Sequence, residues 1–531
     1  MDEARLAELI DPAEPPYRGT RPRLFLFFLP YVVGCALALR GGVVVTDATF
    51  FLIPILIALL LEYLGGYLYS RHFPWLKAGR ILALMLALGL LLGSRVKTQE
   101  NTLLPPPKTL PTVVRLLTDP KLNLWGANAQ VSLRLVGDSC GAWQTYDLRG
   151  KLRFYAEDSV AMTLRAGDIV VAQVNFRQYA NRDSVTGFDY VAWQRSQGSL
   201  FTARVRANTA RRIGHEVSSA SFSLFSQIHA HVLKAYAAAE LSGQPLQLVK
   251  AMSVGDRSDL DQEIRQCFSR AGVAHVLALS GLHVGFIYIL LSYFARVFLL
   301  TSWWRRLLRR LLPLLGVWLF VGVAGATPSL LRAAIMLTVW GISRFAYVRL
   351  HPLDVLAIAA FVILWFSPES LFSLSFQLSF AALLGIVLLY PYVRAVIPLR
   401  PALWRWGAEL LAVSLCAQLG TLPITLYVFG TLPLLSLFTN LVVIPLVTII
   451  VPSALLLAFL PLGSLVSQGL GFLLQNAASF LIGATEKIAP LPFISLTGVY
   501  IPLWAAWLLG LFLLGIGLVR LLKEGERGKK K

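Results

Sequence analysis

The chain of 531 residues is 56% hydrophobic and only 14% charged, whereas soluble domains carry roughly 25% charged residues. This composition excludes an ordinary soluble enzyme and predicts a protein that crosses a membrane many times. The formal net charge of +20 has two physical interpretations, because Lys and Arg in short loops set membrane orientation, and a basic surface also attracts polyanions. Most basic residues from Arg296 to Arg405 fall in loops between apolar runs, so orientation explains most of the charge.

Apolar runs predict about 12 membrane spans, since a helix needs roughly 20 apolar residues to cross a hydrocarbon core ~30 Å thick. The first spans lie in residues 24–95 and the others in residues 273–522. Several runs are short or contain Gly and Pro, which predicts tilted, broken or re-entrant helices. The runs are Leu24–Leu39, Val43–Leu61, Ile81–Gly93, Val276–Leu300, Leu311–Ala326, Leu330–Ile342, Val355–Phe366, Leu371–Tyr390, Ala408–Phe429, Leu432–Leu460, Leu465–Ile482 and Ile501–Leu522.

Basic clusters assign an orientation to these spans, because Lys and Arg are enriched in cytoplasmic loops. The tail of residues 1–23 and the loop with Arg71, Lys77 and Arg80 are basic. They are expected in the cytoplasm, together with the basic tail of residues 523–531. The same alternation places residues 96–215 on the outer side. The first run has no small-residue cleavage pattern after it and is expected to be a retained span.

Residues 96–215 differ in kind from the spans, because short runs of alternating polarity are separated by turn residues. Such runs predict β-strands, and five of them in one small domain favour a closed β-barrel such as an OB fold. A β-sandwich is the alternative. The predicted strands are Thr112–Leu117, Gln130–Val136, Thr145–Tyr155, Ile169–Phe176 and Leu200–Val205.

Residues 216–272 alternate polar and apolar side chains at helical spacing and predict amphipathic helices that are too polar to cross a membrane. We expect them to lie along the membrane surface or to pack on the mouth of the helical domain. Four acids, Asp256, Asp259, Asp261 and Glu263, fall near the predicted start of one helix, where the helix dipole favours negative charge.

Polar groups inside apolar runs carry the functional signal, because burying them in lipid is costly. His275 and His283 are eight residues apart, which is about 80° around a helix at 3.6 residues per turn. Ser280 and Gly281 between them are expected to interrupt that helix. A broken helix suits a polyanion path, while a small-residue packing face with two hydrogen-bonded histidines is the alternative.

Four further elements carry polar groups in apolar surroundings. Arg332, after Pro328, is expected either to extend to the interface or to bind phosphate from a pore wall. Asp354 fits a helix N-terminus. The other polar positions either line a passage or bond neighbouring helices; they are Ser375, Gln377, Ser379, Gln418 and Asn440.

Catalytic and metal-binding patterns are weak. Ser280 with His283 or His275 suggests a nucleophile and base, but neighbours three positions apart on one helix rarely align for proton transfer. No Walker A loop or H-E-x-x-H run is present, and we expect no catalytic residue, no metal and no cofactor. The four cysteines form no C-x-x-C pair; a Cys140–Cys267 disulfide is an open alternative to free thiols.

These elements, in this order, resemble the ComEC family of competence proteins. The resemblance is carried by His275–Gly285, Pro328–Ala334, Asp354 with Ser375–Phe380, Gln418–Pro423 with Phe429, Gly430 and Asn440, and upstream by Gly187–Tyr190 and Gly198–Arg204. It extends from about residue 25 to residue 505. The chain departs from the family at Ser184–Thr186, where the family often has Asn-Pro-Gly.

The resemblance implies a bacterial inner-membrane channel that passes single-stranded DNA into the cytoplasm during natural transformation, by a path along the polar residues named above. It implies an OB-like domain on the outer side that holds the strand by basic and aromatic side chains. The residues considered for that contact are Trp143, Lys151, Arg153, Phe154, Tyr155 and Phe176. A transporter for another solute is the alternative function.

The resemblance also implies partners. They are single-stranded DNA, membrane lipids, a DNA receptor outside and a cytoplasmic helicase-type motor. The family often ends in a β-lactamase-like metal domain thought to degrade the other strand. The sequence stops at Lys531 without such a domain, so we expect a separate protein to supply the nuclease.

Overall fold

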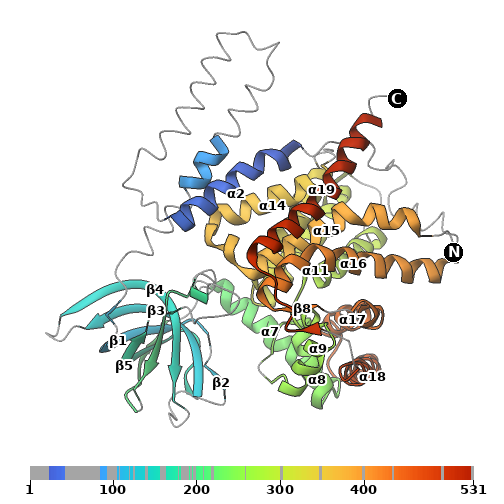
Figure 1. Ribbon diagram of the computed structural model, residues 1–531. Helices are drawn as coiled ribbons and strands as arrows, with labels where there is room; N and C mark the ends of the chain where they lie inside the picture. Colours follow the sequence, from blue (N-terminus) through green and yellow to red (C-terminus); the bar gives the residue numbers. More distant parts are fainter. Residues whose placement is uncertain are drawn as a thin grey trace.

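The computed structural model describes residues 23–41, 84–91 and, with short internal gaps, 105–527. It consists of a mostly helical body and a separate β domain beside it (Figure 1). Several predicted features lie outside the described residues: the span Val43–Leu61, the loop with Arg71, Lys77 and Arg80, Cys140, residues 1–22 of the N-terminal tail and residues 528–531 of the C-terminal tail. Cys267 has a free thiol.

All five predicted strands of the β domain are confirmed, and two shorter ones, β2 and β7, are added. The strand β7 was missed because most of its side chains are exposed and carry no apolar alternation. The strands are β1 Thr109–Leu116, β2 Lys121–Asn123, β3 Gly126–Gly137, β4 Trp143–Phe154, β5 Asp168–Arg177, β6 Phe201–Val205 and β7 Arg211–His215.

The strands of the β domain pair in the order β1-β3-β4-β6-β5-β7, and β1 also pairs with β5. The path β1-β3-β4-β6-β5 therefore returns to its starting strand. All neighbours along this path are antiparallel except β4 and β6, which are parallel. Alternate residues face inward, as the period of two along a strand requires, and they form one apolar core that includes Val131, Leu152 and Val174.

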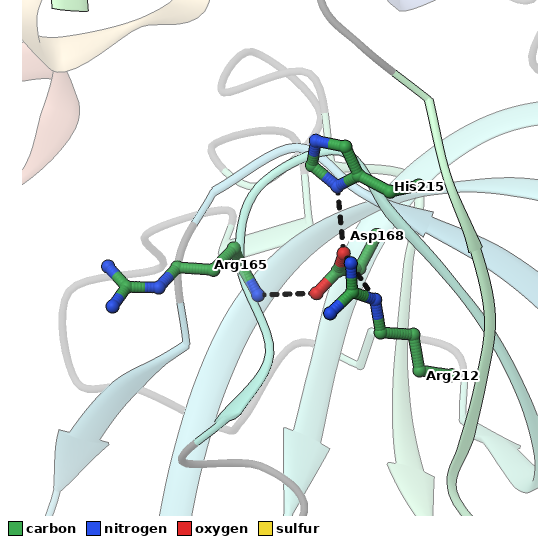
Figure 2. A network of polar contacts seen from close by, with 4 residues as sticks. All are labelled: Arg165, Asp168, Arg212 and His215. Carbon is green, nitrogen blue, oxygen red and sulfur yellow. Dashed lines mark hydrogen bonds and ion pairs between the residues drawn. The ribbon is translucent and has the colours of Figure 1, made fainter.

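The exit of the chain from the β domain is fixed by the buried carboxylate of Asp168 (Figure 2). One oxygen, Oδ2, accepts the Arg165 backbone N–H at 2.7 Å, and Oδ1 lies 2.8 Å from His215 Nδ1 and 2.9 Å from Arg212 Nε. Burial alone would raise the pKa of Asp168, but these donors and positive charges hold it below its ordinary value. Because Arg212 and His215 belong to β7, Asp168 ties the last strand to β5.

Three amphipathic helices follow: α7 Ala220–Ala238, α8 Gly243–Ser253 and α9 Gln262–Arg270. Asp261 is the N-cap of α9 and accepts the backbone N–H of Glu263, as the acidic cluster predicted. The apolar faces of these helices share one core with α17 Ser436–Leu457 and α18 Leu465–Ile488. They therefore pack on the helical body, which is one of the two predicted positions.

The remaining elements form the helical body. Within the described residues, four helices are long and apolar enough to cross a membrane: α15 Leu374–Val396, α16 Ala402–Val428, α17 and α18. Shorter apolar helices are α14 Pro352–Phe366 and parts of α2 Arg23–Gly41, α11 Gly281–Phe298 and α19 Leu503–Arg527. The predicted number of spans stays a prediction. The elements are α2 Arg23–Gly41, α10 Ala274–Leu277, α11 Gly281–Phe298, α12 Trp303–Val323, α13 Pro328–Phe345, α14 Pro352–Phe366, η1 Pro368–Phe372, α15 Leu374–Val396, α16 Ala402–Val428, β8 Thr431–Leu432, β9 Leu496–Thr497 and α19 Leu503–Arg527.

Candidate functional site

The predicted helix interruption at Ser280 and Gly281 is confirmed: α10 ends at Leu277 and α11 begins at Gly281. The Ser280 backbone N–H donates to His283 Nδ1 at 3.1 Å, and Ser280 Oγ lies 2.9 Å from the same nitrogen. A side chain at the third helical position that reaches back to the N-cap N–H is half of a capping box. His283 fills the place that Glu or Gln usually takes.

The protonation of His283 follows from this contact. A backbone N–H can only donate, so Nδ1 accepts and the proton of the neutral ring lies on Nε2. His283 is fully buried, and Nε2 has no hydrogen-bond partner among the described residues. His275 lies on α10 and is exposed. Ser280 and His283 are therefore in hydrogen-bond contact, although we did not expect this from their spacing. The contact belongs to a helix cap. Within the described residues no carboxylate bonds to His283 Nε2, so the ring lacks the group that orients a catalytic histidine.

A second break in the helical course of the chain is the turn that joins α12 to α13, two helices that pack against each other in opposite directions. The N–H of Ala326 bonds to Val321 O at 2.8 Å and the N–H of Gly325 to Gly322 O at 3.3 Å, which is the Schellman pattern of a helix end. Gly325 has φ +80° and Ala326 has φ +48°. A positive φ is strained for alanine, so the turn that leads into α13 is held by its surroundings.

Arg332, on the first turns of α13, is buried and only 4% exposed. Its Nη2 donates to Ser375 Oγ on α15 at 2.7 Å, so the structure brings two of the predicted residues together. Its Nε has no hydrogen-bond partner in the part of the chain that the structure describes. Among the described residues, no carboxylate lies within ion-pair distance of this guanidinium. Extension to the interface is therefore wrong for Arg332, because its side chain ends inside the protein.

A third segment, the α8–α9 loop with Gly255 and Arg257, packs against both breaks. A methyl group on Gly255, which has φ +77°, would lie 2.7 Å from Leu279 Cδ1 and 3.3 Å from Ala324 O. Arg257 Nε is buried and has no hydrogen-bond partner among the residues whose structure is described. Sequence reasoning missed this segment, because Gly-Asp-Arg between two polar helices carries no signal that separates it from an ordinary loop.

Two predicted residues have local structural roles. Gln377 Nε2 donates to Leu371 O at 3.0 Å and so bonds the turn before its own helix. Asp354 accepts the backbone N–H of Phe25 at 3.0 Å and lies in the first turn of α14. This confirms the helix N-terminus interpretation of Asp354 and adds the start of α2 as a second partner. Ser379 lies one turn after Ser375 on α15.

Gln418 and Asn440 join neighbouring helices. Gln418 Nε2 donates to Ser436 Oγ, and Asn440 Nδ2 lies 3.4 Å from Ser414 Oγ. Both contacts connect α16 with α17, which is the helix-bonding alternative for these residues. Asn440 Oδ1 is buried without a partner in the described part of the protein.

The β domain places basic side chains on the outside of β4 and β6. Arg153 lies beside Arg204 in the parallel pairing of these strands, and both are exposed. Lys151 is half-buried and donates to Gln194 Oε1 at 2.9 Å. Burial lowers its pKa, and Arg153 lowers it further. We call this surface the basic face; it comprises Arg149, Lys151, Arg153, Arg204 and Arg206.

The aromatic residues considered for DNA contact divide into two groups. Trp143 is 49% exposed and Tyr155 is 46% exposed, at the two ends of β4. Phe154 and Phe176 are 2% and 3% exposed and belong to the core of the β domain. The prediction that these two phenylalanines stack on bases is wrong, because alternation along each strand turns their rings inward.

The fold and these polar clusters define a class: a helical membrane protein with broken helices and a separate β domain. Comparison with known proteins narrows the class. The sequence profile described as "Competence protein" matches residues 252–523. The chain therefore belongs to the competence protein family, as the resemblance to the ComEC family predicted.

Individual relatives agree with this assignment. The chain is 36% identical to ComE operon protein 3 of Bacillus subtilis over 208 residues, which are 39% of this chain and 25% of that protein. It is 24% identical to Recombination protein 2 of Haemophilus influenzae over 329 residues, 60% of this chain and 40% of the relative. It is 28% identical to Competence protein ComA of Neisseria gonorrhoeae over 271 residues, 47% and 36% of the two chains. The chain thus spans less than half the length of these relatives. No solved structure matches it.

Proposed function

We propose that the protein is an inner-membrane channel that passes single-stranded DNA into the cytoplasm during natural transformation. Family membership over residues 252–523 is the observation that carries this proposal. One relative is named Competence protein ComA, and competence is the state in which a cell takes up DNA. The interrupted helix α10–α11 supports it further, because such a break turns backbone donors and polar side chains toward a path inside a membrane domain.

The β domain is the proposed entry platform for the strand. The ring of pairings β1-β3-β4-β6-β5-β1, with β4 parallel to β6, supports a closed barrel of the OB type. The basic face supplies positive charge for the DNA backbone, and Trp143 and Tyr155 supply exposed rings for stacking on bases. Exposed arginines favour phosphate contact without base specificity, because backbone contacts carry no sequence information.

The direction of transport also leads to a proposed membrane orientation and to proposed partner proteins. The β domain faces outward and receives the strand from a DNA receptor, both termini lie in the cytoplasm, and a helicase-type motor draws the strand in. Basic loops on the cytoplasmic side support this orientation.

Deletion of the gene in a naturally transformable host tests the proposal. Transformants should fall to background, while labelled double-stranded DNA still binds to the cell surface, because the defect lies at the inner membrane. Expression of the intact chain from a second locus should restore transformation. Unchanged transformation in the deletion strain would overturn the proposal and favour a transporter for another solute.

A further inference from the structure

The hairpin formed by α17 and α18 has no charged side chain before the last turn of α18. No Asp, Glu, Lys, Arg or His stands between Glu409 and Glu486. The connection between the two helices, residues 458–464, therefore lacks the basic residues of the loops after α13 and α15, which contain Arg349 and Arg400. Such residues hold a loop on the cytoplasmic side of a membrane, so nothing in this connection anchors it there.

Contacts between the helices define two sides of the helical body. α13 and α15 begin on the same side, because Arg332 near the start of α13 donates to Ser375 at the start of α15. α15 and α16 are antiparallel, since Arg394 near the end of α15 lies 3.9 Å from Glu409 near the start of α16. The α12–α13 turn and the end of α16 therefore lie on one side. We call it the β-domain side, because α7, which follows the β domain, contacts the end of α12.

Both the base and the tip of the hairpin lie on the β-domain side. At the base, α17 follows β8 and α18 precedes β9, and these two strands pair next to the end of α16. At the tip, His231 Nε2 on α7 donates to Ala458 O at 3.1 Å. Two positions earlier, His229 Nδ1 donates to Val323 O, at the end of α12, also at 3.1 Å. The chain therefore enters and leaves this hairpin from one side.

The hairpin lies across the neighbouring helices rather than along them. Figure 1 shows α17 and α18 nearly end-on, whereas α15 and α16 run across the picture. Asn440 near the start of α17 lies 3.4 Å from Ser414 in the middle of α16, and the other end of α17 lies beside α7. A hairpin of two membrane spans would instead run parallel to α15 and α16.

The two faces of the hairpin have different surroundings. One face packs on α8 and α9 in a core that includes Leu474 and Leu481, and the outer face of α9 carries exposed charges such as Glu263 and Arg270. The opposite face of α18 and the tip are apolar and exposed, an arrangement that fits the boundary between water and lipid. The exposed large side chains of this surface are Phe459, Leu462, Leu465, Val466, Phe472, Leu473 and Phe480.

The backbone of the tip suits a position near lipid, where polar groups must be satisfied within the protein. The N–H groups of Ala458, Phe459 and Leu460 bond to carbonyl groups of the last turn of α17. Pro461 has no N–H to satisfy, and the carbonyl group of Ala458 accepts from His231.

We propose that the α17–α18 hairpin is a re-entrant element that inserts into the lipid leaflet on the β-domain side and does not cross the bilayer. The acyl chains of that leaflet contact the tip and the apolar face of α18, while α8 and α9 cover the hairpin from the water side. Two predicted spans, Leu432–Leu460 and Leu465–Ile482, thus become one segment without a crossing. The number of crossings falls by two, so the C-terminal tail keeps its side.

The test locates the tip in the full chain, reconstituted in liposomes of phosphatidylethanolamine and phosphatidylglycerol. The native cysteines are replaced by alanine, and one new cysteine carries the fluorophore nitrobenzoxadiazole. Leu462→Cys reports on the tip, Asp147→Cys on the β domain, and Val396→Cys on the opposite side, at the exposed end of α15. Dithionite in the external buffer destroys only the fluorophores that face outward, because this anion does not cross the bilayer.

The fraction of fluorescence destroyed identifies the side. In a preparation with unequal numbers of the two orientations, position 462 should match position 147 and differ from position 396. A match with position 396 would overturn the inference, because two spans would place the tip opposite the β domain. Leu465→Cys is a second position at the tip and should behave like Leu462→Cys.

Lipids with a nitroxide on the acyl chain measure insertion. The fluorophore at position 462 should be quenched more strongly by a nitroxide near the headgroup than by one at the chain end, and the fluorophore at position 147 by neither. Absence of quenching at positions 462 and 465 would overturn the proposed lipid contact.

The unaltered chain provides an independent measurement. A phospholipid with a photoreactive acyl chain should attach to residues 459–480 and leave α9 Gln262–Arg270 unlabelled; equal labelling of the two segments would contradict the proposed layers. None of these measurements involves DNA, so their failure would leave the proposed function unchanged.

Discussion

At the scale of single residues, the buried charge of Asp168 holds the strand β7 against β5. Asp168→Asn should destabilise the pairing of β5 with β7 by about 2 kcal/mol, because a neutral amide weakens the bonds to Arg212 and His215. Hydrogen exchange at residues 168–177 and 211–215 of the full chain would measure this. Asp147→Asn, at an exposed position on β4, should leave exchange unchanged; equal effects of the two substitutions would contradict the assignment.

The same carboxylate predicts a pH dependence. The pKa of Asp168 is lower in the folded protein than in the unfolded chain. The ionised carboxylate therefore stabilises the folded protein at any pH above the unfolded pKa of roughly 3.9. This stabilisation is lost as the pH falls from there through the pKa of the folded state. Protection of β7 should therefore be constant near neutrality and decline below about pH 4. The Asp168→Asn protein should lack this step, and a decline that persists in it would have another origin.

Ser280 separates a cap from a catalytic serine. Ser280→Ala removes the hydroxyl but retains the backbone N–H that bonds to His283. We expect a loss of about 1 kcal/mol, typical of a capping side chain, and transformation near the wild-type level. His283→Leu should have a larger effect, because the Ser280 N–H loses its acceptor. Complete loss of activity in Ser280→Ala, with normal amounts of protein in the membrane, would instead favour Ser280 as a nucleophile with a histidine as its base.

At the scale of elements, α15 and α16 approach so closely that their crossing depends on glycine. A methyl group on Gly420 would lie 3.0 Å from Gly385 Cα and against the backbone of Ala381. Gly420→Ala should therefore destabilise the helical body by roughly 1–3 kcal/mol, the usual range for overpacking. Gly483→Ala makes the same change on α18, where nothing lies within 4 Å of the new methyl group, and should stabilise slightly. Thermal unfolding in detergent should show a lower unfolding temperature for Gly420→Ala and a slightly higher one for Gly483→Ala.

The predictable elements are those with local signals. Alternating polarity predicted β1, β3, β4, β5 and β6, and Ser280-Gly281 predicted the first helix break. The inward direction of Phe154 was also predictable, because Leu148 and Leu152 share its face of β4. The return of β5 to β1 is a contact between distant segments, which local periodicity does not encode. The meeting of Arg332 with Ser375, 43 positions apart, is of the same kind.

At the scale of the whole molecule, the support for function differs between the two parts. The competence profile begins at residue 252, so it covers the helical body from the end of α8 onward and does not include the β domain. A role of the β domain in DNA binding therefore depends on its own surface. The net charge of +20 is not enough for this, since loops explain most of it; the gathering of arginines on β4 and β6 is the specific observation.

The basic face makes a quantitative prediction for the intact protein. Each phosphate contact to single-stranded DNA contributes a slope of about −0.7 to the dependence of log affinity on log salt. Arg153→Gln combined with Arg204→Gln should therefore reduce the slope by about 1.4 if each arginine makes one contact.

A matched substitution locates that effect on the surface. Arg134→Gln is the control, because Arg134 lies on β3 and pairs with Glu216 at 3.3 Å, so it should change the slope little. Fluorescence anisotropy of a labelled oligothymidylate over a salt series measures all three proteins. An unchanged slope in the double variant would place DNA binding elsewhere on the chain.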